Sequence, residues 1–143
     1  MNLNVGRAVL AGIIATAVMT VVSVVVTPTM GMPKMNPAEM LAGRMGGNMA
    51  LGWTAHFMIG TTLALIYAAV AAAFPGPPPV RGALYGVAPW LLAQVAVMPM
   101  MGMGFFSGSM TMAGGSLAGH LIYGATVGAV YGAPAARART STA

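Results

Sequence analysis

Residues 8–26 read AVLAGIIATAVMTVVSVVV, an apolar run without a charged side chain. About 20 consecutive apolar residues are enough for a helix to cross the ~30 Å hydrocarbon core of a bilayer. Three further runs of similar length, at 50–74, 83–101 and 113–132, also lack charged residues. Because backbone groups in lipid must find partners within their own segment, we predict that all four runs form transmembrane helices.

The composition of the whole chain indicates the same class. Hydrophobic residues make up 58% of the chain and charged residues 5%, whereas charged residues account for about 25% of a soluble domain. We therefore predict an all-α integral membrane protein, multi-pass in a bacterial inner (plasma) membrane, with residues 1–143 in a single transmembrane domain. The absence of cysteine excludes disulfides and thiolate metal sites. The few basic residues lie at the ends of the apolar runs, which argues against a nucleic-acid partner.

Sequence landmarks recur in the same order in the two halves of the chain. Residues 28–32 (PTMGM) recur as residues 99–103 (PMMGM), and residues 56–60 (HFMIG) recur as residues 120–124 (HLIYG). Because each half holds two apolar runs, the halves would enter the membrane in the same orientation, related by a pseudo-two-fold axis along the membrane normal. The predicted architecture is therefore two tandem helical hairpins, at residues 1–74 and 81–133.

The basic residues predict the orientation of these hairpins. Four fall on one side and two on the other: Arg7, Arg81, Arg137 and Arg139 against Lys34 and Arg44. Cytoplasmic loops carry an excess of Lys and Arg, so both termini are expected in the cytoplasm. The polar, basic segment at 134–143 is expected to be a disordered tail.

The loop after the first apolar run predicts a short helix of its own. Asn36 is a good N-cap residue, Pro37 suits the first helical position, and Glu39 falls where a capping box needs an acid. Gly46 and Gly47 would end the helix. Its apolar side would be formed by Met40, Leu41 and Met45.

The only two histidines, His56 and His120, occupy equivalent positions of the repeat and lie inside predicted helices. Small residues recur at every fourth position around each histidine, so the imidazole should lie in a seam where helices pack closely. Ionisable residues within membrane spans are rare and are functional candidates. Imidazole is a common metal ligand, and thioether ligands favour Cu(I). These residues predict a soft-metal site, with copper as the ion, formed by His56, His120, Met30, Met32, Met101 and Met103.

Three other interpretations of the histidines remain open. The imidazoles can be structural, hydrogen-bonding to neighbouring helices while methionine fills irregular apolar gaps. They can ligate one haem b from facing helices, although closely packed helices leave little room for a macrocycle. They can also take part in proton or substrate handling.

The acidic residues argue against an enzyme. The chain has no Asp, and its single acid, Glu39, lies in a loop, so paired carboxylates and a Ser–His–acid triad are excluded from the helices. We expect no catalytic residues and a non-catalytic binding or accessory role in the membrane. The alternatives are a small oligomeric transporter or channel-like protein, and a bis-His haem b electron-transfer subunit. Expected partners are the lipid bilayer and either a homo-oligomer or a larger membrane complex.

The pattern of His56–Phe57 and residues 120–124 (HLIYG), with Pro-x-Met-Gly-Met after the first and third apolar runs, resembles uncharacterised small four-span bacterial membrane proteins. The resemblance covers nearly the whole chain. It implies a membrane location and a four-helix architecture, and it carries over no activity, ligand or partner.

Overall fold

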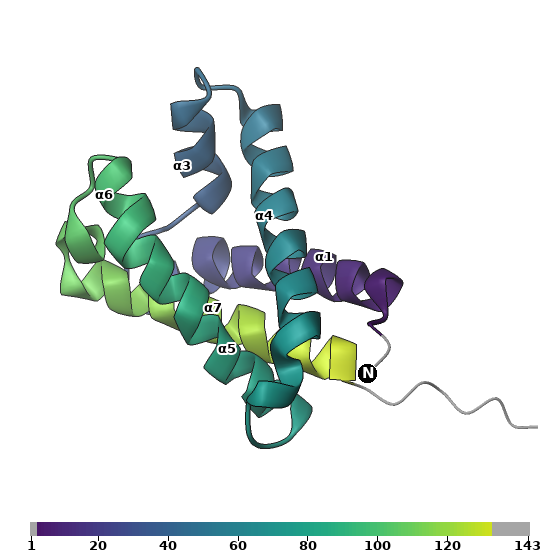
Figure 1. The fold of residues 1–143 in the computed structure, drawn as a ribbon. Coiled ribbons are helices and arrows are strands. Elements are labelled where there is room, and N and C mark those ends of the chain that lie inside the picture. The colour runs from purple at the N-terminus through teal and green to yellow at the C-terminus, as the bar shows by residue number, and fades with distance from the viewer. Residues whose placement is uncertain (1–2, 133–143) are drawn as a thin grey trace, which may run out of the picture.

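The computed structural model describes residues 3–132, which form helices and connecting turns without a strand (Figure 1). The predicted disordered tail at 134–143 lies outside the described residues. The long helices are α1 (Val5–Val21), α4 (Met49–Val70), α5 (Pro78–Leu92) and α7 (Met110–Gly132). Shorter helices are α2 (Thr27–Thr29), α3 (Pro37–Arg44) and α6 (Met98–Met100), with π-helices η1 (Val22–Val26) and η3 (Ala93–Val97) and 3-10 helices η2 (Ala71–Ala73) and η4 (Phe105–Gly108).

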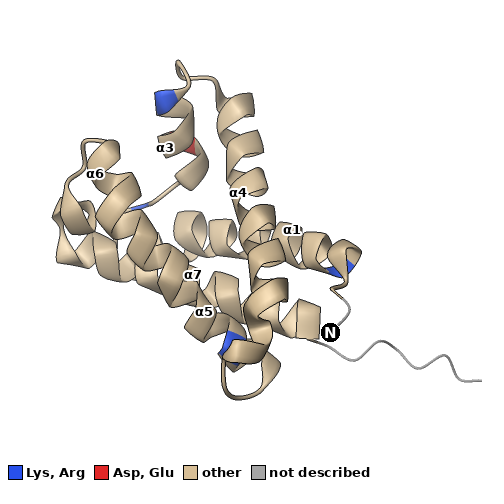
Figure 2. Cartoon of the chain, viewed as in Figure 1, with Lys and Arg blue, Asp and Glu red and all other residues tan. Residues whose placement is uncertain are grey.

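Three helical stretches are long and apolar enough to cross a membrane, judged by length and composition. These are Val5–Thr29, Met49–Ala73 and Pro78–Met100, and they coincide with the first three predicted runs. The fourth run is helical as α7, which is 23 residues long. Its glycines and polar side chains lower its hydropathy, so it is not among the three. The charged residues that the structure describes lie near helix ends and in or beside α3, outside the middles of the long helices (Figure 2).

Glycine allows α5 and α7 to pack together along most of their lengths (Figure 1). A Cβ atom added at Gly82 would overlap the carbonyl oxygen of Gly124, and one added at Gly86 would overlap that of His120. Helices in lipid associate through such close backbone approach, because lipid tails are as apolar as the side chains. Since α7 also packs against α1, it joins the two halves of the chain.

The first half contains a second closely packed pair, α1 and α4. A Cβ atom added at Gly12 would lie 2.7 Å from the Cα atom of Thr61, and one added at Gly60 would overlap the hydroxyl of Thr16. Small residues thus set the separation of the helices in both halves.

The predicted short helix forms as α3. The Asn36 side chain accepts hydrogen bonds from two backbone amides of the first turn, and Gly46 and Gly47 leave the helix with φ of +68° and +79°. α3 packs against α4 because Gly52 has no side chain, and a Cβ atom there would overlap the carbonyl oxygen of Ala38.

α1 and α5 both widen into a π-helix just before a proline. In each case the amide of the residue preceding the proline bonds to the carbonyl five residues back. A proline ring collides with the carbonyl four residues before it in a regular α-helix, and a π-turn at this position relieves the collision at Pro28 and Pro99. Gly31 and Gly102, with φ of +77° and +73°, then turn the chain out of the helix. The two Pro-x-Met-Gly-Met segments therefore share one backbone geometry.

Tyrosine hydroxyls connect the two halves inside the fold. The Tyr85 hydroxyl on α5 donates to the Leu63 carbonyl at 2.8 Å, and the Tyr123 hydroxyl on α7 donates to the Gly60 carbonyl. Both rings belong to the main cluster of buried side chains, which is otherwise largely alanine. Leu63 and Gly60 lie on α4, so these bonds fasten α4 to the second half of the chain.

Candidate functional site

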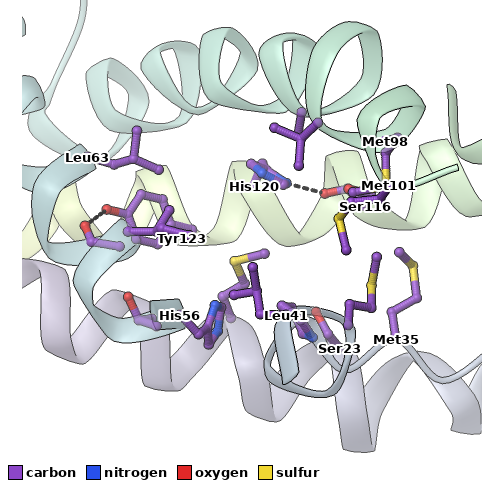
Figure 3. Close-up of a pocket in the computed structure, with 18 residues that line it drawn as sticks. Ser23, Met35, Leu41, His56, Leu63, Met98, Met101, Ser116, His120 and Tyr123 are labelled. Carbon is purple, nitrogen blue, oxygen red and sulfur yellow. Dashed lines mark hydrogen bonds between the residues drawn. The ribbon is translucent and has the colours of Figure 1, made fainter. Parts of the chain in front are cut away.

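A cavity of about 160 Å³ lies where α1, α3, α4, α6 and α7 come together (Figure 3). His56 and His120 both line it. Several methionines contribute to its largely apolar wall: Met19, Met35, Met40, Met98 and Met101. No Lys, Arg or Glu of the described residues lines the cavity, so the two imidazoles are its only basic groups.

His56 lies on α4, is 7% exposed and is held by α1. Its Nε2 atom lies 2.9 Å from the Thr20 hydroxyl oxygen, and that hydroxyl donates to the Thr16 carbonyl at 2.7 Å. A hydroxyl has one proton to donate, so the Nε2–H of the neutral ring donates to Thr20. This hydrogen-bond pattern assigns the lone pair of the ring to Nδ1.

His120 lies on α7 and is tied to its own helix. Its Nδ1 atom lies 2.8 Å from the Ser116 carbonyl oxygen. Because a carbonyl can only accept, Nδ1 carries the proton and the lone pair of the neutral ring lies on Nε2. Metal-binding histidines commonly donate their other ring N–H to a carbonyl in this way, which fixes the ring and its tautomer.

Each half of the chain therefore contributes to the cavity wall one imidazole whose second ring nitrogen has no hydrogen bond. Among the described residues, no fully buried side-chain nitrogen or oxygen lacks a hydrogen-bond partner. The nitrogens without a hydrogen bond, Nδ1 of His56 and Nε2 of His120, therefore keep some accessible surface. Figure 3 shows the two rings on opposite walls of this cavity. The ring neighbours of His56 are Trp53 and Phe57, at centroid distances of 6.3 and 6.0 Å.

The predicted methionine ligands do not all reach the cavity. Met101 lines it, whereas Met30 is 69% exposed, Met32 lines a separate small pocket, and Met103 is half-buried outside the lining. Gly31 lies between Met30 and Met32, and Gly102 lies between Met101 and Met103. The positive φ of each glycine turns the chain at the helix end, so the methionines on its two sides lie in different surroundings. Among the described residues, no group of three or more His, Cys, Asp or Glu side chains is placed to hold a metal.

The sequence analysis missed the cavity residues of other elements. Met35, Met40 and Leu41 reach the cavity because α3 folds back onto α4. The apolar side of α3 predicts that Met40 and Leu41 are buried. Nothing in the sequence identifies the helices against which they pack.

Gln94 is a second feature that the sequence analysis missed. It is 0% exposed in η3, its Nε2 donates to the Ser116 hydroxyl at 3.3 Å, and its Oε1 accepts from the Ser107 hydroxyl at 2.9 Å. Ser107 and Phe106 have φ of +58° and +51°, which is costly for residues other than glycine. This network anchors the turn after α6 to the helix that carries His120. A single amide within the apolar run 83–101 was its only signal.

The chain was compared with known protein families, curated proteins and solved structures. Searches among curated proteins and among solved structures found no match. A family model described as "Family of unknown function (DUF6789)" matches residues 3–142. The chain therefore belongs to this family of unknown function, DUF6789.

Proposed function

We propose that the chain is a four-span protein of a bacterial inner membrane that binds a soft metal ion, Cu(I), without catalysing a reaction. α7 is the proposed fourth span. Its 23 residues correspond to about 35 Å of helix at 1.5 Å per residue, which is enough to cross ~30 Å of hydrocarbon. Gly124 and Gly128 of α7 face the backbone of α5, so its low hydropathy reflects helix contacts and does not require contact with water.

Charge and local geometry support the proposed two-hairpin topology. Arg7 and Arg81 lie near the starts of α1 and α5, whereas Lys34 and Arg44 lie in the segment between α2 and α4. Both termini are proposed to be cytoplasmic under the positive-inside rule. The same π-turn, proline and left-handed glycine in η1–α2 and η3–α6 support a pseudo-two-fold relation between the hairpins.

The proposed ligands are the two imidazoles and two of the thioethers that line the cavity. Nδ1 of His56 and Nε2 of His120 would bind the ion, with the Met101 and Met98 thioethers as sulfur ligands. The observation that carries the proposal is the meeting of two such imidazoles with several thioethers in one cavity that lacks carboxylates. Mg²⁺ and Ca²⁺ prefer oxygen ligands, and thioether sulfur selects Cu(I).

The volume of the cavity favours an ion over haem b. Pockets for drug-sized ligands measure about 300–1,000 Å³, whereas this cavity measures about 160 Å³. A space of this size is too small for a haem macrocycle and large enough for a single ion.

A competition titration tests this function. The protein, purified and placed in lipid nanodiscs, is titrated anaerobically with Cu(I) against a chromophoric chelator. His120→Ala and Met101→Leu are each expected to weaken binding by at least about tenfold. Loss of a residue that only supports a metal ligand already weakens binding on this scale. Met30→Leu is the matched control, because Met30 is 69% exposed and outside the cavity.

Two results would contradict the proposal. One is unchanged Cu(I) affinity in His120→Ala, which would leave both histidines as structural residues. The other is equal weakening by Met30→Leu and Met101→Leu, which would mean that copper binds methionine without regard to position. A sharp Soret band in the purified protein would instead support haem.

A further inference from the structure

A second, much smaller pocket adjoins the cavity. Its volume is about 10 Å³, and three methionines from two parts of the chain line it: Met32, Met35 and Met112. Met35 and Ser23 line both the pocket and the cavity, so the two spaces are neighbours. A space of this size admits a single water-sized particle, which excludes an organic ligand.

The three methionines are brought together by defined contacts. The positive φ of Gly31 turns the chain back after α2, and the Met32 sulfur lies 3.7 Å from the position that a Gly115 Cβ atom would occupy on α7. Met112 lies three residues before Gly115, on the same face of that helix. The Met35 amide donates to the Ser23 carbonyl at 3.4 Å, which holds the loop against η1.

The remaining groups of the pocket include no carboxylate and no amide side chain. They are hydroxyls, a proline and a glycine: Ser23, Thr27, Thr111, Pro33 and Gly115. The Thr27 hydroxyl already donates to the Ser23 carbonyl at 2.7 Å. The only acid of the chain, Glu39, lies 3.9 Å from the Lys34 ammonium and does not line the pocket.

We propose that Met32, Met35 and Met112 form a thioether-only site for a soft monovalent cation, Cu(I), which passes the ion to the histidine cavity. The transfer rests on the proposed function of that cavity, whereas binding at the three thioethers does not. Neutral thioether ligands suit Cu(I), whereas zinc sites use thiolate, imidazole or carboxylate ligands and Mg²⁺ and Ca²⁺ prefer oxygen. Exchange to the cavity requires no change of oxidation state and proceeds through Met35, which lines both spaces. The imidazole ligands make the cavity the stronger site.

Binding stoichiometry in nanodiscs tests this site, with Cu(I) as the probe. The whole chain is expected to bind two ions, and a His56→Ala/His120→Ala variant is expected to keep one. Adding Met112→Leu to that variant is expected to abolish binding. Adding Met110→Leu, at a helix position two residues away that is 76% exposed, should leave the remaining ion bound. In the unaltered background, Met112→Leu alone should reduce two ions to one, which gives a second measurement if the double histidine variant does not fold.

The outcomes separate the two proposals. A chain that binds one ion, lost entirely in the double histidine variant, overturns the thioether site and leaves the cavity site standing. A double histidine variant that binds as the parent does overturns the cavity site alone. Equal effects of Met112→Leu and Met110→Leu overturn the thioether site, because the three methionines would then serve only as packing.

Discussion

Gly86 is one of the residues that allow the close approach of α5 and α7. The carbonyl oxygen of His120 occupies the space where a side chain would begin. Backbone atoms cannot move aside as a flexible side chain does, so a methyl group here must separate the helices. Gly114 lies on α7, and a Cβ atom added there would have no neighbouring atom within 4 Å.

This difference predicts opposite effects for two identical substitutions. Gly86→Ala is expected to lower the free energy of unfolding by about 1–3 kcal/mol, the usual cost of overpacking. Gly114→Ala should raise it slightly, by up to about 1 kcal/mol, because alanine favours the helix. Titration with denaturing detergent in mixed micelles measures both. Equal effects of the two substitutions would mean that α5 and α7 do not pack at Gly86.

At the level of elements, α3 connects the cavity wall to the second half of the chain. Met40 and Leu41 line the cavity, and the Arg44 guanidinium at the end of α3 donates to the Met101 carbonyl beyond it. Met101 follows α6, where the positive φ of Gly102 turns the chain out of the helix. Arg44 therefore links α3 to the second half at Met101, a residue of the cavity wall.

Loss of this link predicts a more accessible cavity. One such bond contributes about 1 kcal/mol, which changes an equilibrium constant about fivefold. If modification needs the cavity to open, Arg44→Gln should therefore speed the modification of His120 by diethyl pyrocarbonate about fivefold. Mass spectrometry of the modified peptide gives the rate. Lys34→Gln is the control, because its ammonium pairs only loosely with Glu39, at 3.9 Å. A rate equal to that of the control would show that Arg44 does not restrict entry.

For the molecule as a whole, the proposed topology requires that successive connections lie on alternating sides of the membrane. The chain contains no cysteine, so single cysteines can be introduced without altering other residues. Lys34, Pro77 and Phe105 are exposed positions in three successive connections, and Ser141 follows α7 in the sequence.

Labelling of intact cells with an impermeant maleimide should follow this alternation. Lys34→Cys and Phe105→Cys are expected to react from outside, and Pro77→Cys and Ser141→Cys only after lysis. Reaction of Phe105→Cys and Ser141→Cys from the same side would refute α7 as the fourth span. The unaltered, cysteine-free chain is the background control.

Several elements could be predicted because they depend on residues close together in the chain. Three apolar runs contain enough consecutive residues to form candidate spans, and length and hydropathy are properties of a run alone. α3 begins after Asn36 because its side chain bonds to amides two and three residues later.

The sequence by itself determined the helices, their apolar character and the two histidines as the basic groups inside them, because these follow from local composition and spacing. Only the tertiary structure decided which side chains surround those histidines. Met35 and Met40 reach the cavity because α3 folds onto α4 at Gly52, whereas Met30 remains exposed beyond a helix end. Such neighbours depend on close backbone contacts between segments distant in the sequence, and hydropathy and periodicity contain no information about which glycine will face which carbonyl.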